Sequence, residues 1–472
     1  MKNESVWNKY LEKENKKLNE DIECDVLIIG GGISGLLTSY NLNNSNLKVV
    51  LVDRNSIGSG ISSKMTAKVT ILQDILTKIS DNDLSLYLKS QMDGLKLLQN
   101  NIKNNNLECD FFKNDSYLFT TKNSNIKKLK RIEEFLDINR IRYSNSKLPI
   151  KELESVYSIK IADSYEINPI KYINNIKKLC TNILMFENTN IIEVVKENKM
   201  FIARCNNKKK IITKRIVFAT NYPYFLKPLF FPIKVRLEKS FIGYGSTNSL
   251  FEERFNAINI DKKVHSIRFY KDKMIYLTNS KLLPSSTNNS NLYRGLSNNL
   301  ISQYENIWSN VDIVTNDYLP IVGEVLKDLY IITGYNAWGI LSSHIGASVI
   351  ASLIKKDRKY LKYKELFKPR KKVTLKKFTN SSINVYENMY GFLKGIITKN
   401  NLVFYSKNEA MYIDRDGSSY VVKRKCPHMK CNLIFNEVEK TWDCPCHASR
   451  FDLSGNVIAG PSKYDIKVEK NT

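Results

Sequence analysis

Four cysteines and two histidines fall within one short window near the C-terminal end of this chain, and both residue types can bind metal. Cys426 and His428 are followed, after fifteen residues, by Cys444 and His447. Thiolate and imidazole are typical ligands of iron and zinc. A C-x-H half-motif with a C-x-x-H half-motif supplies two ligands of each kind. The window therefore predicts a metal centre clamped between two loops.

The pattern resembles the ligand set of Rieske [2Fe–2S] centres, in which two cysteines hold one iron and two histidines hold the other. Zinc is a competitor, but the ligands of a zinc-finger half-site stand about two to four residues apart, so C-x-H is a poor match. A disulfide-only module or a decayed, metal-free domain would not explain four ligands beside two further cysteines. We therefore expect Cys426, His428, Cys444 and His447 to bind a [2Fe–2S] cluster.

The Rieske resemblance also implies roles for side chains beside the ligands. It implies that the two remaining cysteines, Cys431 and Cys446, form a disulfide that ties the loops together. A disulfide is unusual in a reducing compartment, but the loops around a cluster would bring this pair together and shield it. Ser449 is expected to donate a hydrogen bond to a cluster sulfur, and residues 459–461 resemble the loop that covers the cluster.

Two positions depart from the Rieske pattern. Lys430 and Ala448 stand where that family usually has glycine. Glycine adopts a positive φ angle without strain, whereas a side chain in a tight loop does not. We expect these residues to alter the exposure or the potential of the cluster while leaving its ligands intact.

A glycine-rich turn near the other end of the chain predicts a dinucleotide site. Residues 25–53 are expected to form a strand, a turn, a helix and a second strand. Gly30, Gly32 and Gly35 form G-x-G-x-x-G at this turn, which permits a tight bend, close approach to a pyrophosphate and close helix packing. The helix N-terminus offers N–H groups to phosphates, and Asp53 ends the second strand where it can bind a ribose. The motif does not distinguish NAD from FAD.

Several dispersed segments resemble the D-amino-acid-oxidase-like (glycine oxidase) family of FAD-dependent oxidoreductases. They are residues 53–54, 58–68, 187–191, 215–220, 317–323 and 329–340. The resemblance covers roughly residues 20–355 and implies FAD as the cofactor. The sequence contains no second G-x-G-x-x-G, so we do not expect a dedicated NAD(P)H domain.

The resemblance implies which residues contact FAD, on the fingerprint, the strand ends and the C-terminal flavin motif. They are Gly30, Gly32, Ile33, Ser34, Gly35, Asp53, Arg54, Thr66, Ala67, Ile191, Ala219, Thr220, Gly334, Trp338, Gly339 and Ile340. Asp53 replaces the glutamate that is common in the family, and both acids can bind a ribose. Ile340 replaces a common methionine, a change that leaves a backbone contact in place.

The sequence does not identify a catalytic residue. Thr66 and Lys68 are the candidates nearest the expected flavin. Lys68 could polarise the flavin or bind a substrate carboxylate, and an ordinary surface lysine is the alternative. Arg236 and Tyr244 are further candidates for a substrate carboxylate, on composition alone, and His265 is more simply a surface histidine than a base.

These sites need two kinds of scaffold, so we expect an α/β region and an all-β region. The fold class is a Rossmann-like FAD-binding domain with an antiparallel-sheet substrate domain, followed by a small Rieske iron–sulfur β domain. The expected boundaries are 1–75, 170–235 and 311–360 for the FAD-binding domain, 76–169 and 236–310 for the substrate domain, 361–380 for a basic linker and 381–472 for the Rieske domain.

The 472-residue chain has a formal charge of +26. The basic residues are spread along the sequence, so we expect no nucleic-acid partner. The densest run, residues 355–377, holds twelve basic and two acidic residues. It is interpreted as a solvated helix end and linker, with an acidic redox partner or an anionic membrane surface as the alternative. The sequence contains no bilayer-spanning apolar stretch and no signal-peptide pattern, so we expect a cytoplasmic protein without an integral membrane segment.

The two cofactors together predict an FAD-dependent oxidoreductase acting as a dehydrogenase. A small-molecule substrate, an amine or amino acid, would reduce FAD. The cluster would pass electrons singly to an external one-electron acceptor, for which an acidic redox protein is a candidate. Two alternatives stay open: a reductase that runs in the opposite direction with the cluster as electron entry, and a redox sensor without rapid turnover.

Overall fold

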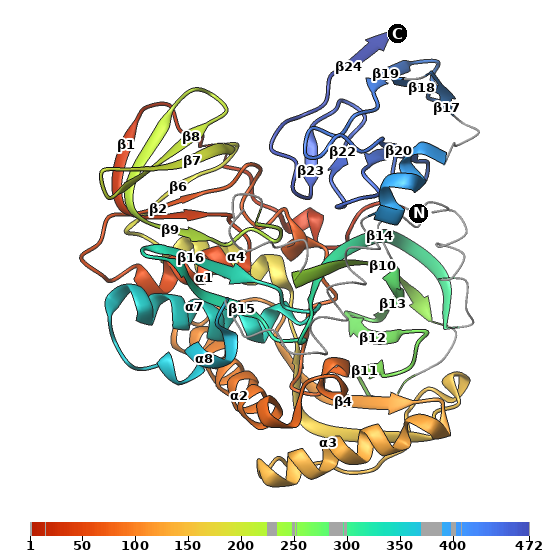
Figure 1. The fold of residues 1–472 in the computed structure, drawn as a ribbon. Helices are drawn as coiled ribbons and strands as arrows, with labels where there is room; N and C mark the ends of the chain where they lie inside the picture. The colour runs from red at the N-terminus through yellow and green to blue at the C-terminus, as the bar shows by residue number, and fades with distance from the viewer. Residues whose placement is uncertain are drawn as a thin grey trace.

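The chain is described here by a computed structural model. The described residues are 2–14, 16–223, 234–247, 251, 253–282, 296, 300–369, 389–397, 403–406 and 408–471. Residues 370–380 of the basic linker expected at 361–380, and residues 381–388 at the start of the expected Rieske domain, lie outside them. Figure 1 shows two large sheets side by side, with the C-terminal β region (blue) at the top of the molecule.

The glycine fingerprint lies in the first of these sheets, which has eight strands in the described part of the chain. Its order is β15-β16-β9-β1-β2-β6, and β7 and β8 extend it from β9. The pairs among β16, β9, β1, β2 and β6 are parallel, which suits the continuous buried runs, rich in Val, Leu and Ile, of β2, β16 and the second half of β1. The strands are β1 (Ile22–Ile29), β2 (Val49–Val52), β6 (Ile183–Phe186), β7 (Ile191–Glu197), β8 (Met200–Cys205), β9 (Lys210–Phe218), β15 (Ile321–Leu326) and β16 (Leu329–Thr333).

Most of the helices pack on this sheet or on one another. The helices are α1 (Ile33–Leu42), α2 (Asp81–Asn104), α3 (Ile126–Ile138), α4 (Pro169–Leu179), α7 (Gly339–Lys355) and α8 (Lys364–Phe367). Helix α3 packs on strands of the second sheet. Helix α7 packs against both α1 and α2. Its residues are buried nearly all round because it lies between these neighbours and the sheet. The crossing with α2 is close at Gly94, where a methyl group would lie 2.6 Å from the carbonyl oxygen of Leu341.

The second sheet also has eight strands in the described residues, in the order β14-β10-β13-β12-β11-β4-β5-β3. The expectation of an antiparallel sheet holds for its pairings except that of β4 with β11, which is parallel. These two strands lie far apart in the sequence, so the long connection permits either direction. The strands are β3 (Lys68–Val69), β4 (Phe112–Thr120), β5 (Tyr157–Glu166), β10 (Val235–Thr247), β11 (Phe255–Asn259), β12 (His265–Tyr270), β13 (Lys273–Leu282) and β14 (Ile301–Thr315).

The C-terminal region contains two small antiparallel sheets. One has the order β17-β18-β19-β24 and the other β20-β21-β22-β23. Its core is aromatic, because Trp442 is fully buried against Phe435. The strands are β17 (Val403–Tyr405), β18 (Glu409–Ile413), β19 (Ser419–Lys423), β20 (Ile434–Asn436), β21 (Thr441–Asp443), β22 (Arg450–Phe451), β23 (Val457–Ala459) and β24 (Val468–Asn471).

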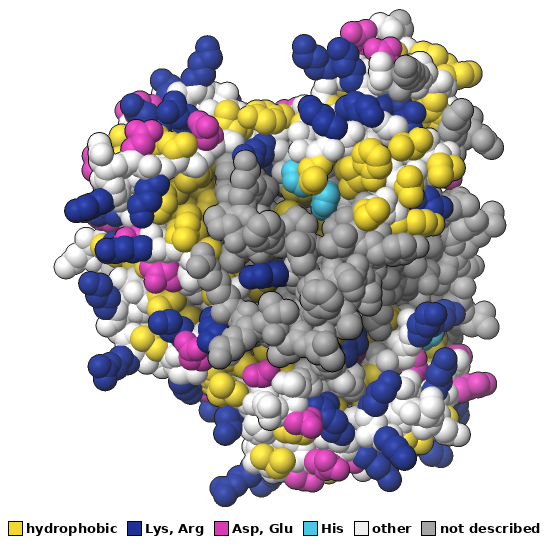
Figure 2. Space-filling model, viewed as in Figure 1, with side chains coloured by type: hydrophobic (Ala, Val, Ile, Leu, Met, Phe, Trp, Pro, Cys, Tyr) yellow, Lys and Arg dark blue, Asp and Glu magenta, His cyan; other side chains and the backbone are white. Residues whose placement is uncertain are grey.

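The surface charge and the helices bear on two expectations from the sequence, which concern a nucleic-acid partner and an integral membrane segment. On the face drawn in Figure 2, the described Lys and Arg side chains are scattered among acidic and apolar ones. This dispersal agrees with a charge that is spread over the chain. Among the described helices, none is both long enough and apolar enough to cross a membrane.

The close crossing of α2 and α7 predicts the effect of a single methyl group. Gly94→Ala should lower the free energy of unfolding by about 2 kcal/mol, because the methyl would meet backbone that cannot move away, and this outweighs the better helix propensity of alanine. Urea denaturation followed by far-UV circular dichroism would measure the change. The matched control is Gly346→Ala on α7, where the methyl would lie 3.1 Å from a movable side-chain atom of Ile332. The control should stay within about 1 kcal/mol of the parent, and equal losses at both positions would contradict the packing argument.

Candidate active site and metal centre

The two cysteine–histidine half-motifs form loops of matching shape. The first lies between β19 and β20, and the second between β21 and β22. In the first loop the N–H of Cys426 donates to the carbonyl oxygen of Cys431 at 2.9 Å. In the second the N–H of Cys444 donates to the carbonyl oxygen of Ser449 at 2.7 Å. Each loop is thus closed by backbone hydrogen bonds of its own.

The positions where glycine was expected are the bends of these loops. Lys430 has φ 61° and Ala448 has φ 54°, both in the left-handed region. Their N–H groups donate to the carbonyl oxygens of Cys426 (2.9 Å) and Cys444 (3.1 Å). A non-glycine residue in this region costs about 1 kcal/mol or more. Each loop therefore makes a tight, hydrogen-bonded bend at this position and carries the strain of a side chain there.

The four candidate ligands lie close together, and the two histidines among them each have a ring nitrogen without a hydrogen-bond partner in the described structure. Cys426 is fully buried and Cys444 nearly so, and a hydrogen bond with the Cys444 thiol is the largest effect that lowers the pKa of Cys426, to about 7. The rings of His428 and His447 meet edge to face at 5.0 Å. The Nδ1 atom of each is buried and has no hydrogen-bond partner among the described residues.

The protonation state of this donor set suits a metal. Burial lowers the pKa of both imidazoles, His428 and His447, to about 4, so each is neutral at neutral pH and keeps a lone pair. A buried polar atom without a partner is rare and needs an explanation. Two neutral imidazoles beside two thiols fit a [2Fe–2S] cluster of the two-cysteine, two-histidine kind.

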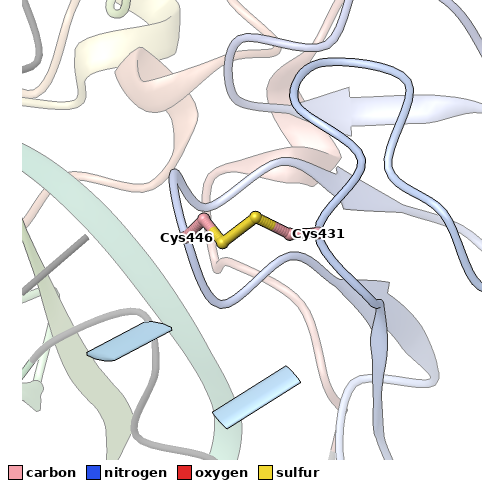
Figure 3. Close-up of a disulfide and its surroundings, with 2 residues drawn as sticks. All are labelled: Cys431 and Cys446. Atoms are coloured by element: carbon pink, nitrogen blue, oxygen red, sulfur yellow. A yellow bond between two sulfur atoms is a disulfide. The ribbon is translucent and has the colours of Figure 1, made fainter. Parts of the chain in front are cut away.

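The remaining cysteine pair is bonded. Figure 3 shows the disulfide between Cys431 and Cys446, which joins the two loops. Their sulfurs lie within 4.8 Å of the sulfur of Cys444, but a disulfide has no thiolate to offer a metal. Ser449 braces the loops from another side: its hydroxyl accepts the N–H of Ser462 at 3.1 Å, and its hydrogen bond contributes to the lowered pKa of Cys426.

A cavity extends along the carboxyl ends of β1, β2 and β9, where parallel sheets bind dinucleotides. The residues expected to contact FAD that line it are Gly30, Gly32, Ile33, Ser34, Asp53, Arg54, Ile191, Ala219, Thr220 and Gly339. Gly35 and Gly334 are not among its lining residues. A methyl on Gly35 would lie 1.9 Å from the carbonyl oxygen of Gly30, so this glycine permits the helix to pack on the strand. Gly334 has φ +75°, which explains glycine at that turn.

Asp53 holds the fingerprint loop in shape. Its Oδ2 accepts the N–H of Gly31 at 2.7 Å and its Oδ1 accepts the N–H of Asn55 at 2.8 Å. Burial raises the pKa of this carboxyl, against the effect of these two donors. Ser62 was not among the predicted contacts, although it lies in the segment 58–68 that resembles the flavin loop of the family; it also lines the cavity and accepts the N–H of Ile33 at 3.0 Å.

A second cavity continues from the first toward the N-terminus of α7. The two share the lining residues Ile61, Met65, Asn221, Tyr335 and Gly339. The second is also lined by Thr66, Ala67, Lys68, Trp338 and Ile340, the other residues expected near the flavin. A continuous cavity from the glycine turn to this helix end has the extended form that a dinucleotide such as FAD would need.

Of the weak catalytic candidates, Lys68 lines the second cavity, whereas Arg236 and Tyr244 are not among its lining residues. Lys68 is buried in the wall of the second cavity, donates a hydrogen bond to Ser266 and is not a surface lysine. Burial, aided by the positive charge of Arg268, lowers the pKa of Lys68 to about 7. Arg236 is committed to an ion pair at 2.7 Å with Glu238. Tyr244 is not among the residues that line this cavity.

These placements correct the suggestion that Arg236 and Tyr244 bind a substrate carboxylate. The guanidinium already has a carboxylate partner, and the phenol packs beside Tyr270 elsewhere in the sheet. His265 begins β12, where its Nδ1 lies 2.7 Å from the hydroxyl of Tyr276. Sequence reasoning missed the polar groups of β10 and β14 that face this cavity, because only strand pairing brings them together.

The iron–sulfur region docks on the dinucleotide cavity. His447, Ala448 and Gly460 line the same cavity as the glycine fingerprint. Arg54 donates from its two Nη atoms to the carbonyl oxygens of Gly460 and Ser462, both at 3.1 Å. One of the candidate cluster ligands therefore lies at the wall of the candidate FAD site.

A buried ion network joins the iron–sulfur region to the second sheet. Arg450 contacts Glu439 at 2.6 Å and Asp443 at 3.1 Å. Lys239 of β10 lies 3.6 Å from Asp443, and Ser309 of β14 donates its hydroxyl to Glu439 at 2.8 Å. Burial opposes ionisation of Asp443, but the charges of Arg450 and Lys239 outweigh it and hold the pKa at about 2.

Comparison with known proteins agrees with this arrangement. The family model described as FAD dependent oxidoreductase matches residues 25–353. The chain belongs to the FAD dependent oxidoreductase family. The model of the Rieske [2Fe-2S] domain matches residues 395–469. The protein is thus an oxidoreductase of this family with a C-terminal Rieske domain, and its cofactors are FAD and a [2Fe–2S] cluster, as expected from the sequence.

One relative shares nearly the whole architecture. The Rieske 2Fe-2S iron-sulfur protein YhfW of Bacillus subtilis (strain 168) is 24% identical over 489 residues, covering 95% of this chain and 94% of the relative. The gamma-glutamylputrescine oxidoreductase of Escherichia coli (strain K12) is 29% identical over 153 residues, covering 31% of this chain and 35% of the relative.

Solved structures of flavoproteins share the fold. Glycine oxidase from Geobacillus kaustophilus has a TM-score of 0.63 at 14% identity, covering 75% of this chain and 100% of that one. L-proline dehydrogenase from P. horikoshii has a TM-score of 0.62 at 16% identity, covering 75% and 98%. The expected fold class is confirmed: a flavoprotein fold of two sheets, followed by a small all-β Rieske region.

The buried network predicts that one arginine holds the Rieske domain in place. Arg450→Met should lower the free energy of unfolding of the Rieske domain by about 3 kcal/mol, because two buried carboxylates lose their nearest cation and keep the more distant Lys239. Urea denaturation followed by the visible circular dichroism of the cluster would measure the loss. Arg204→Met is the matched control, since its pair with Glu193 is more than half exposed, and it should change stability by less than about 0.5 kcal/mol. Equal effects of the two variants would contradict a docking role for the network.

The strained bends predict a stabilising substitution. Ala448→Gly should raise the free energy of unfolding of the loaded Rieske domain by about 0.5–1 kcal/mol, because glycine adopts φ 54° without strain and this exceeds its entropic cost. Thermal melting of the cluster absorbance would report the gain. Ala459→Gly in β23 is the control; it has no positive φ to relieve and should destabilise by a similar amount. A loss at Ala448 would show that its methyl packs better than its backbone is strained.

Proposed function

We propose that this protein is a dehydrogenase that oxidises a small amine or amino acid and passes the electrons singly from FAD through the Rieske cluster to an external acceptor. The observation that carries the proposal is the shared cavity: His447 of the Rieske domain and Gly30 of the FAD domain line the same space. Two redox groups held this close within one chain need no diffusing carrier between them.

The proposal assigns the cluster and the flavin to particular residues. Cys426, His428, Cys444 and His447 hold the cluster, and the disulfide of Cys431 with Cys446 braces its loops. The FAD-binding residues are the ones expected from the sequence that line the two joined cavities, and Gly35 and Gly334 shape the turns beside them. FAD accepts a hydride from substrate, and the cluster exchanges one electron at a time.

The substrate end of the cavity is lined by side chains that include Thr66, Lys68 and Trp338. Lys68 is buried there and Thr66 lies beside it, so the candidates face the space beside the expected flavin ring. With its pKa lowered to about 7, Lys68 can exchange a proton near neutral pH. Trp338, whose indole N–H donates to Asp74 at 3.0 Å, closes one wall against water.

The substrate class is supported by the relatives. The relatives include a gamma-glutamylputrescine oxidoreductase, named for an amine derivative, and the structural neighbours include a glycine oxidase and an L-proline dehydrogenase. An acidic redox protein is the acceptor that the net charge of +26 favours, because opposite charge speeds association.

Anaerobic reduction tests the electron path. The loaded protein would be mixed without oxygen with a panel of amino acids and alkylamines, while flavin absorbance and the electron paramagnetic resonance signal of the reduced cluster are followed. We expect one substrate class to bleach the flavin and then to reduce the cluster, since both lie on one cavity. Bleaching of the flavin without any cluster signal would exclude the proposed path.

A ligand variant provides the control. His428→Ala removes one candidate ligand and lies in the loop that is not among the residues lining the FAD cavity. We expect the variant to lose the cluster signal and turnover with a one-electron acceptor, and to keep bleaching of the flavin by substrate. If it keeps full turnover with that acceptor, the electrons leave from the flavin and not from the cluster.

A further inference from the structure

One wall of the substrate cavity is built from two paired strands. Glu238 of β10 lies directly opposite Asp312 of β14, and Ser240 lies opposite Asn310 two residues further along the pair. Residues two apart on a strand share a face, and residues opposite each other across a pair point the same way. All four side chains line the cavity that also holds Lys68. The pairing therefore places two carboxylates and two neutral polar groups on one wall.

The two carboxylates differ in their partners. Glu238 is neutralised by Arg236, which contacts it at 2.7 Å. Asp312 accepts hydrogen bonds from the side-chain nitrogen of Asn310 at 3.2 Å, and no described cation forms an ion pair with it. Burial and the nearby charge of Glu238 raise the pKa of Asp312 to about 7. Asp312 is thus a buried carboxylate that lacks a cation in the described structure.

Two further acceptor atoms on this wall also lack partners. The Ser240 hydroxyl belongs to a side chain that is 2% exposed, and the Oδ1 of Asn310 to one that is 4% exposed. Neither atom has a hydrogen-bond partner among the described residues. Since the Asn310 nitrogen already donates to Asp312, its oxygen is directed away from that carboxylate. Buried polar atoms without partners are uncommon and mark a place where a ligand group can bind.

We propose that Asp312, Asn310 and Ser240 form a binding subsite for an ammonium group of the substrate. The inference rests on the proposed function, in that it takes this cavity to be the substrate cavity, and it narrows the substrate class to amines that present a cation to β14. An ammonium group has three N–H donors and no acceptor. The subsite offers a carboxylate, an amide oxygen and a hydroxyl oxygen to receive them.

The charges around the cavity favour a cation over an anion at this wall. Lys78 pairs with Asp74 at 3.6 Å, and Lys68 donates to Ser266, so both cations of the cavity are engaged elsewhere. A substrate carboxylate on the β14 wall would face the carboxyl groups of Asp312 and Glu238. The nearby arginine, Arg236, is already paired with Glu238. An ammonium group there gains a charge-assisted hydrogen bond and removes an unpaired buried charge.

Binding of two small probe ions tests the subsite without turnover. The full-length protein, loaded with FAD and cluster, would be titrated with tert-butylammonium chloride, whose carbon next to nitrogen has no hydrogen to give up as hydride, and with sodium butanoate, ions of four carbons each and opposite charge. The absorbance of the flavin reports occupancy of the cavity. We expect tert-butylammonium to bind the parent protein more tightly than butanoate. Tighter binding of butanoate would overturn the proposal whatever the variants do.

Asp312→Asn is the decisive variant. It preserves shape and removes the charge, so it should weaken tert-butylammonium binding about tenfold or more and leave butanoate unchanged or tighter. It should keep its FAD content and its melting temperature, because asparagine has no charge to bury. Asp163→Asn is the matched control, since it removes the same charge from an exposed residue of β5 and should change neither affinity. Unchanged tert-butylammonium affinity in Asp312→Asn, or loss of FAD from it, would overturn the subsite.

The outcome separates this inference from the proposed function. If tert-butylammonium binds through Asp312 but no amine bleaches the flavin, the subsite stands and the proposed oxidation of amines fails. If amines bleach the flavin and Asp312→Asn binds tert-butylammonium as the parent does, the proposed function stands and the subsite fails. The two results use different readouts, binding in one case and reduction in the other.

Discussion

Arg450, Glu439 and Asp443 meet Lys239 in a buried ion network where the Rieske domain rests on the second sheet. Charges buried this deeply are tolerated only when each has its partner, so the network favours one orientation of the two parts over others. That orientation brings the loop after β21, with His447, onto the dinucleotide cavity. The geometry of the two cofactor sites relative to each other follows from this contact.

The strand pair β10 and β14 contributes side chains to both cavities and to the contact with the Rieske domain. Along β10 and β14, side chains alternate between two faces. Leu237 and Val311 line the dinucleotide cavity, and Lys239 on the same face reaches the Rieske domain. Glu238 and Asp312 face the substrate cavity instead. A shift of one residue in the pairing would exchange these roles, so the register of this strand pair links substrate binding to cluster docking.

Much of the chemistry could be predicted because the residues that carry it lie within short segments of the sequence. The glycine fingerprint requires particular residues within a few positions of one another, and so does each cysteine–histidine half-motif. The positive φ angles found at Lys430 and Ala448 were likewise foreseen from the departure of these positions from glycine. The parallel pairing of β4 with β11 could not be read in this way, because the strands are separated by more than a hundred residues and either direction is open to them.

The sequence by itself determined the two cofactors and the class of fold, since local spacing places ligands on a loop and glycines on a turn whatever the rest of the chain does. Only the tertiary structure decided where those loops face, that Arg236 is already paired, and that Asp312 and Asn310 share a wall of the cavity. These facts depend on burial and on contacts between distant strands. Pairing and desolvation are properties of the folded chain, and no single segment of the sequence carries them.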